Sequence, residues 1–253
     1  MRRALKYFGV GVVVLAALGW VALWAWGNSR HADPGPAALA ALSSDSTVTV
    51  VEDGQFLVFR PTLQEPRLGV VFYPGASSDL RGYAPVLRRL AAAGYFVVGV
   101  SMPLEFAFLA PDRAADAQAA YRQVSRWAII GHSLGGAMAA SFVHRHPEDV
   151  QGLIIWDSYP PPNESLAEFP RPVWHIHRAT PDGAPPAAFA ANRQLFPSSS
   201  RWVPIPGGIH MYFGDFVGGG YVEDWEPSIT RGEHQDRAVT ATLEALREME
   251  SAG

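Results

Sequence analysis

Largely apolar runs alternate with segments of helical character along most of the chain. Two segments of strand character, 47–51 and 55–59, flank the turn Glu52-Asp53-Gly54 and predict an antiparallel hairpin. Further strands are expected in the apolar runs 68–72, 96–100, 127–130, 150–156, 173–177 and 201–205. Helices are expected at 83–93, 112–124, 137–146, 185–196 and 235–249. Strands without an exposed face that alternate with helices predict an α/β fold, with a mostly parallel central sheet and helices on both faces.

The spacing of these elements predicts one domain over residues 45–253. The sequence contains no internal repeat and no change of composition that would divide this region. The connection Asp157 to Arg171 is about 15 residues long, which is near the upper end of ordinary loops. We therefore expect no large cap domain and a site that is open or covered only by loops.

The N-terminus has the pattern of a membrane anchor. Residues 1–6 form a basic leader, and residues 7–26 contain no charge. A helix of about 20 residues, at about 1.5 Å per residue, spans a bilayer core of about 30 Å. Three tryptophans crowd the far end of the run, where amphipathic rings favour the membrane interface: Trp20, Trp24 and Trp26.

We expect this anchor to remain uncleaved, because the apolar run is long and ends in bulky residues. Cleavage near Ala32, which would release a secreted protein, is the alternative. The basic leader predicts a cytoplasmic N-terminus and a domain outside the cytoplasm. Residues 27–44, with Pro34-Gly35-Pro36, are expected to form a linker.

Composition excludes several classes of function. The formal net charge is −4 and the arginines are scattered, so no nucleic-acid surface is indicated. The chain has no cysteine, which excludes disulfides, thiolate nucleophiles and cysteine-ligated metals.

The segment Gly131-His132-Ser133-Leu134-Gly135-Gly136 carries the strongest chemical signal. It lies between a predicted buried strand and a predicted helix, which is the context of a nucleophile elbow. A serine at such a reversal has a strained backbone, and its neighbours two positions away must lack a Cβ. The sequence therefore predicts Ser133 as a nucleophile at the positive end of a helix.

A serine nucleophile needs a base, and the base in turn needs an acid that orients it. With this elbow, the acid and then the histidine follow the serine along the chain. His210 lies in the loop after the last predicted strand and is expected to be the base. His234, at the start of a helix among charged residues, is expected to lie on the surface.

Two aspartates are candidates for the acid. Asp182 occupies the turn Thr180-Pro181-Asp182-Gly183 after the strand at 173–177, and it is the preferred choice. Asp157 directly ends the preceding strand and is the alternative.

Stabilising a developing oxyanion requires two fixed backbone N–H groups. One is expected from Leu134, the residue after the nucleophile. The loop after the strand at 68–72 reads Tyr73-Pro74-Gly75-Ala76, and the N–H of Ala76 is expected to be the second donor.

Two pairs of histidines have i, i+2 spacing, His144 with His146 and His175 with His177. On a strand, His175 and His177 would point to one face, but no third ligand or carboxylate spacing accompanies them. We therefore expect no metal site. Aromatic residues follow His210 closely, and we expect some of them to be core and others to line a substrate pocket: Tyr212, Phe213, Phe216, Tyr221 and Trp225.

From about Leu68 to Leu246 the chain resembles the α/β-hydrolase family, and within it the bacterial group often called the "alpha/beta hydrolase fold-5" type. The segments that carry the resemblance are Phe72-Tyr73-Pro74-Gly75, Tyr83-Ala84-Pro85, Gly94-Tyr95, Met102-Pro103-Leu104, Gly131 to Ala140, Pro206-Gly207-Gly208-Ile209-His210, Phe213-Gly214-Asp215, Ser228-Ile229-Thr230-Arg231 and Gln235. The chain departs from the group at Ile209, where Asn is frequent, and at Met211-Tyr212.

The resemblance implies an α/β-hydrolase fold without a large cap, and a triad of Ser133, Asp182 and His210. The expected function is a membrane-anchored serine hydrolase that acts on a small-molecule ester or related acyl substrate and needs no cofactor. An acyltransferase that uses the same triad, and a non-catalytic binding module on the same fold, are the alternatives.

Overall fold

The computed structural model describes residues 2–66 and 68–251. Its centre is an eight-stranded sheet with the strand order β2-β3-β5-β4-β6-β7-β8-β9. The hairpin β2–β3 is antiparallel and pairs in the antiparallel sense with β5, whereas all other neighbours are parallel. The strands are β2 (Val48–Asp53), β3 (Phe56–Pro61), β4 (Gly69–Tyr73), β5 (Phe96–Val100), β6 (Trp127–His132), β7 (Leu153–Trp156), β8 (Val173–Ala179) and β9 (Arg201–Pro206).

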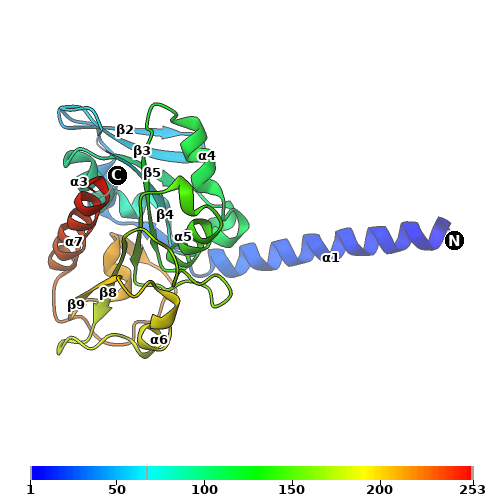
Figure 1. Cartoon of the computed structure of the whole chain (residues 1–253). Coiled ribbons are helices and arrows are strands. Elements are labelled where there is room, and N and C mark those ends of the chain that lie inside the picture. The colour runs from blue at the N-terminus through cyan, green and yellow to red at the C-terminus, as the bar shows by residue number, and fades with distance from the viewer. Residues whose placement is uncertain (1, 67, 252–253) are drawn as a thin grey trace.

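Helices cover both faces of this sheet (Figure 1). The longer ones of the domain are α3 (Ala84–Ala92), α4 (Arg113–Ala120), α5 (Leu134–Arg145) and α7 (Arg231–Ser251). Shorter ones are α2 (Pro36–Ala41), α6 (Ala187–Ala191), η1 (Leu80–Tyr83), η2 (Pro103–Glu105), η3 (Ala107–Leu109), η4 (Pro147–Asp149), η5 (Arg193–Leu195) and η6 (His210–Phe213). Figure 1 shows α3 and α7 on one side of the sheet and α4 and α5 on the other. The predicted α/β-hydrolase architecture is confirmed.

Alternation of side chains along the strands divides the core into two clusters. In β4, Val70 and Phe72 pack in the cluster that contains α3 and α7, whereas Val71 and Tyr73 pack in the cluster with α4 and α5. Because both faces of a central strand are covered in this way, its sequence is apolar at every position.

The two edges of the sheet differ in chemistry. At one edge, β9 contains Pro204 and Pro206, which have no N–H to offer to a further strand. At the other edge, β2 ends in the exposed residues Glu52 and Asp53.

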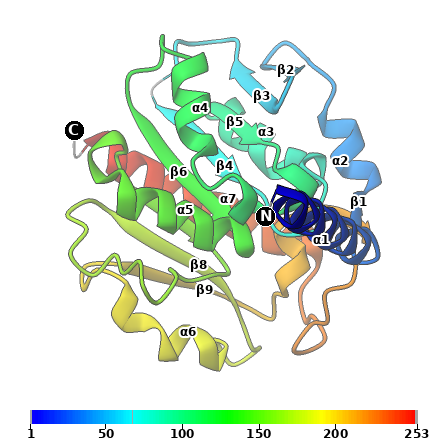
Figure 2. The same cartoon turned by 90° about the vertical axis from the view of Figure 1, so that its right-hand side faces the viewer.

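The N-terminal helix α1 (Arg2–Asn28) projects from the domain as a single long rod (Figure 1). Its segment Gly11–Asn28 is long and apolar enough to cross a membrane, and almost none of it is buried against the domain. Figure 2, which looks along α1, shows that it joins the domain close to β1 (Ala32–Pro34).

The segment expected as a linker is ordered on the domain. β1 pairs in the antiparallel sense with β10 (Phe216–Gly218), and α2 follows directly. Pro36 is the first residue of α2, where its missing N–H costs nothing. The Asp215 carboxylate accepts the N–H of Ala38 at 2.9 Å. Proline and glycine thus mark a helix start here rather than a flexible connection.

Most predicted elements lie within a few residues of the observed ones, and two helices are shorter than expected. The helix predicted at 112–124 ends at Ala120, and that at 185–196 divides into α6 and η5. Residues 157–171 form a loop of turns and bends with no inserted domain, as predicted.

Candidate active site

The reversal between β6 and α5 has the geometry that the elbow motif predicts. Ser133 has φ 55° and ψ −128°, a conformation that L-residues rarely adopt, and α5 begins at the next residue. The Ser133 N–H donates to the carbonyl of Trp156 at 3.0 Å, which ties the reversal to the end of β7. Ser133 is half-buried, and its hydroxyl lies at the N-terminus of α5.

Two glycines make this reversal sterically accessible. A Cβ on Gly131 would lie 2.3 Å from the carbonyl oxygen of Gly135. A Cβ on Gly135 would lie 2.3 Å from the carbonyl oxygens of Tyr73 and Pro74. Both contacts are with backbone, which has no room to move, so only glycine fits at either position.

His210 and Asp157 are joined by a short hydrogen bond. His210 begins η6, after the turn that follows β9, and is buried. Its Nδ1 lies 2.5 Å from Oδ2 of Asp157, the first residue after β7. Because Nδ1–H donates to the carboxylate, Nε2 is left as the proton acceptor of the ring.

Asp157 is fully buried and remains an anion. Burial alone would raise its pKa, but the hydrogen bond and charge of His210, together with the charge and backbone N–H of Arg178, hold the pKa well below the usual range. The Arg178 N–H donates to Oδ1 at 2.9 Å, and its guanidinium donates to Oδ2. Asp157 also has φ 52°, which turns the chain at the end of its strand.

The structure does not bring Asp182 to His210. Asp182 lies in an exposed turn, and its carboxylate accepts a hydrogen bond from the hydroxyl of Thr180. That bond lowers its pKa without any contact with the histidine. Of the two candidates for the acid, the structure places the alternative, Asp157, against His210 and leaves the preferred residue, Asp182, away from it.

The two expected oxyanion donors lie beside Ser133. Leu134 is the first residue of α5, and Ala76 lies in the loop after β4. Neither N–H donates to a partner within the described residues. The Gly75 N–H, by contrast, donates to the Tyr83 hydroxyl at 3.0 Å, and that hydroxyl lies 2.8 Å from Nδ1 of His132. These bonds fix the loop while leaving Ala76 and Leu134 able to bind a developing anion.

Cavities border Ser133 on two sides. One, of about 230 Å³, lies between the Ala76 loop and the end of α1. The other, of about 900 Å³, is bordered by Arg178 of β8, Phe189 of α6, Asp224 and residues of the loops after β7, β8 and β10. Ser133, His210 and Tyr221 line both, so a substrate carbonyl at Ser133 has space for a group on either side.

The sequence profile of the alpha/beta hydrolase family matches residues 69–236, which is more than half of the chain. This chain belongs to the alpha/beta hydrolase family. Among curated proteins, none matches its sequence significantly.

Solved structures show the same hydrolase fold at low sequence identity. Est1E from Butyrivibrio proteoclasticus is 14% identical, with a TM-score of 0.55 over 81% of this chain and 100% of its own. A bacterial membrane phospholipase A is 16% identical, with a TM-score of 0.52 over 94% and 99%. A ferulic acid esterase from Streptomyces cinnamoneus is 22% identical, with a TM-score of 0.51 over 74% and 67%. The alpha/beta hydrolase therefore has structural neighbours of the esterase and lipase type.

Three side chains surround the His210–Asp157 pair of this hydrolase. Arg178 and Glu223 were not predicted from the sequence, whereas Tyr221 is one of the aromatic residues expected in the core or in a substrate pocket. Arg178 bridges Asp157 and Asp224, and its Nη2 lies 2.5 Å from Asp224 Oδ2. The Tyr221 ring stacks on His210 with centroids 4.0 Å apart. The Glu223 carboxylate accepts the N–H of His210 at 2.9 Å. A buried partner for Arg178 could have been predicted, because a charge inside the buried strand Val173–Ala179 requires one.

Of the two histidine pairs, His175 and His177 lie in the core, whereas His144 is exposed and His146 is partly exposed. His175 and His177 share one face of β8, as predicted, and their rings stack 4.8 Å apart among Phe189, Phe196 and Trp202. Neither joins a metal-binding cluster, since no such cluster occurs among the described residues.

His234 is fully buried beside Gly208 and Phe213, so the expectation that it lies on the surface is wrong. Burial lowers its pKa to about 3, which keeps it neutral. Its charged neighbours Glu233 and Asp236 are exposed because only one face of α7 packs on the sheet, whereas Arg231 donates to the buried carboxylate of Asp215.

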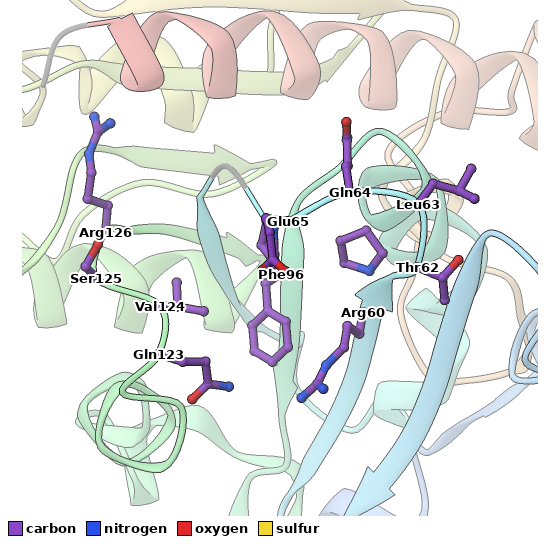
Figure 3. Close-up of a pocket in the computed structure, with 12 residues that line it drawn as sticks. Arg60, Thr62, Leu63, Gln64, Glu65, Phe96, Gln123, Val124, Ser125 and Arg126 are labelled. Carbon is purple, nitrogen blue, oxygen red and sulfur yellow. The ribbon is translucent and has the colours of Figure 1, made fainter.

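A separate cavity of about 510 Å³ lies at the opposite end of the parallel strands (Figure 3). Phe96, which begins β5, lies beneath the guanidinium of Arg60 there, at 5.5 Å from the ring centroid. In open α/β sheets ligands bind at the carboxyl ends of the strands. Ser133, Asp157 and His210 lie at those ends, and this cavity does not.

Proposed function

We propose that this alpha/beta hydrolase is a membrane-anchored serine hydrolase, which cleaves an ester or related acyl bond through an acyl-enzyme. The observation that carries the proposal is the combination of Ser133 at a strained elbow with a buried, ion-paired Asp157 that holds His210. Structural neighbours that include an esterase and a phospholipase support an ester substrate.

In the proposed mechanism, His210 Nε2 takes the proton of the Ser133 hydroxyl while Oγ attacks the acyl carbonyl carbon. The N–H groups of Ala76 and Leu134 bind the oxyanion that forms. The C–O bond to the alcohol then breaks, and the alcohol oxygen takes the proton from His210. Water attacks the acyl-enzyme by the same route and releases the carboxylic acid. Asp157 stabilises the imidazolium at each transfer and keeps its ring oriented.

We further propose that α1 anchors the enzyme, with its basic N-terminus in the cytoplasm and the hydrolase domain outside. The support is the long apolar helix and the arginine and lysine residues at its start. A reporter fused after the C-terminus should be active outside the cytoplasm, and activity only in the cytoplasm would contradict this orientation.

The direct test of the mechanism is labelling of the full chain in detergent with a fluorophosphonate probe. Wild type should be labelled, and both Ser133→Ala and His210→Ala should lose the label. Ester turnover of Ser133→Ala should fall by about 10⁶-fold, as in serine hydrolases that lose their nucleophile.

Ser125→Ala is the matched control, because Ser125 lines the remote cavity rather than the candidate site. It should label as wild type does. A folded wild-type chain that resists the probe and hydrolyses no ester would contradict the mechanism and favour a binding module.

A further inference from the structure

The end of the N-terminal helix forms part of the wall of the smaller Ser133 cavity. Trp26, in the last turn of α1, and Arg30, just after it, line this cavity together with Ser133 and His210. The apolar segment of α1 that could cross a membrane extends to Asn28. The membrane segment and the candidate active site are therefore contiguous.

Side chains hold the helix end in place from the side of η2 and η3. The Trp26 ring stacks on Phe106 with centroids 5.6 Å apart. A Cβ on Gly27 would lie 3.0 Å from the same Phe106 ring, so the helix backbone approaches the domain closely. Nδ1 of His31 lies 2.8 Å from Oε2 of Glu105.

On its other side the helix end is tied to the loop that carries Tyr221. The Arg30 guanidinium donates to the carbonyl of Gly220 at 2.9 Å, and the Gly220 N–H donates back to the carbonyl of Arg30 at 3.0 Å. Tyr221, the next residue, stacks on His210. The Ala32 N–H donates to the carbonyl of Ser77, the neighbour of Ala76, at 2.8 Å. The helix end thus joins the loops on both sides of the reacting atoms.

Exposed apolar side chains lie in the segments that contact the end of α1. We call Phe108, Val217, Tyr221 and Val222 the collar. Phe108, Val217 and Tyr221 are between 42% and 49% exposed, and Val222 is 82% exposed. Phe108 stacks on Phe106, which contacts Trp26, and Val217 pairs with Asp33 in β1. An apolar group of side chains around the base of a membrane helix faces the surface into which that helix inserts.

We propose that the smaller Ser133 cavity opens at the membrane surface, and that its substrate is the acyl ester of a membrane lipid. This inference rests on the proposed serine hydrolase function and on the proposed anchor. The collar lies against the lipid leaflet, and an acyl ester enters the cavity past Trp26 without crossing bulk water. Ser133 Oγ bonds to the acyl carbon, the lipid alcohol leaves with the proton from His210, and water then releases the fatty acid.

The same contacts imply that the anchor is retained in the working enzyme. Cleavage near Ala32 would remove Trp26 and Arg30 from the cavity wall and would break the hydrogen bonds to Gly220. Trp26 and Arg30 therefore act as positioning residues in the acyl-entry wall as well as in the anchor.

The test uses the full chain reconstituted in vesicles of phosphatidylethanolamine, phosphatidylglycerol and diacylglycerol. Fatty acid release from the vesicle lipids is measured beside hydrolysis of the soluble ester p-nitrophenyl butyrate. The variants are Phe108→Asp and Val222→Asp in the collar. The matched control is Leu63→Asp, because Leu63, at 78% exposed, is close to Val222 in exposure but lines the remote cavity.

A charge in the collar disfavours contact with the leaflet, so the ratio of lipid to soluble turnover should fall at least about tenfold in both collar variants. Leu63→Asp should keep the wild-type ratio. An unchanged ratio in the collar variants would overturn the inference. So would a wild type that hydrolyses the soluble ester but releases no fatty acid, and both results leave the proposed function intact. Failure to hydrolyse either ester, with no labelling of Ser133, would instead overturn the proposed function.

Discussion

Asp157 and Asp182 both follow the carboxyl ends of neighbouring parallel strands, yet one is buried and the other is exposed. Asp157 comes directly after β7, has no exposed side-chain surface and contacts both Arg178 and His210. Asp182 comes three residues beyond the end of β8 and lies in solvent with Thr180 as its partner. An aspartate can orient a histidine when the strand end itself places it in the core. A turn that continues past the strand carries its carboxylate away from the site.

The largest expected effect separates the two aspartates by activity. Asp157→Asn should lower kcat/KM by about 10³ to 10⁴-fold, because the amide can no longer hold the His210 ring in the reactive tautomer. The measurement is hydrolysis of a soluble ester by the full chain, with fluorophosphonate labelling of Ser133 in parallel. Near wild-type turnover in this variant would return the acid role to Asp182.

The next effect is on stability and concerns Arg178, which contacts Asp157 but not Asp182. Arg178→Met should lower the free energy of unfolding by about 3 kcal/mol, because it leaves a buried carboxylate with one charged partner fewer. The Arg178 side chain is 7% exposed, so solvent does not replace the lost contact. Chemical unfolding of wild type and variant in the same detergent measures the difference. Equal stabilities would mean that His210 and the backbone N–H of residue 178 suffice to stabilise the Asp157 carboxylate.

A smaller effect is expected in the response to acid. The folded-state pKa of Asp157 is lowered, so its contribution to stability is present above its unfolded pKa of about 4 and is lost as the pH falls toward the folded value. Asp157→Asn should therefore flatten the decline of Tm below about pH 5. Asp182→Asn should keep most of the decline, because solvent screens the exposed carboxylate. The measurement is Tm as a function of pH for all three chains.

The smallest expected effect is that of Asp182→Asn on turnover. Its kcat/KM should stay within about twofold of wild type, as for most surface substitutions away from a site. The same soluble ester serves for this comparison. A large loss would show that the turn at Thr180 moves toward His210 during the reaction.

Much of the fold could be predicted from the sequence because strands and turns are specified by residues that are close together in the chain. The apolar strands and the elbow glycines depend on neighbours within a few residues, and the order of elements then restricts the topology. Ser133 and His210 could be selected in the same way, from the strand and loop in which each lies.

The choice between Asp157 and Asp182 depends on contacts made across the sheet. The sequence favours Asp182, which the structure does not bring to His210. Pro181-Asp182-Gly183 is a strong turn pattern, but turn chemistry does not report burial. The identity of Arg178 as the partner of Asp157, and the burial of His234, likewise follow from packing between distant segments. The ordered contact of β1 with β10 could not be predicted, because a three-residue strand has no periodicity to read.

The prolines of β9 have a consequence for copies of the protein that the proposed anchor would tether to one membrane. Tethered copies of one protein meet edge to edge in two dimensions far more often than they would when dissolved. An open strand edge would then act as a template for joining sheets of neighbouring copies. Pro204 and Pro206 deny that edge two of its N–H donors, and the acidic end of β2 repels a like partner at the other edge. The sheet can therefore keep two open edges without polymerising, even among copies held side by side by the proposed anchor.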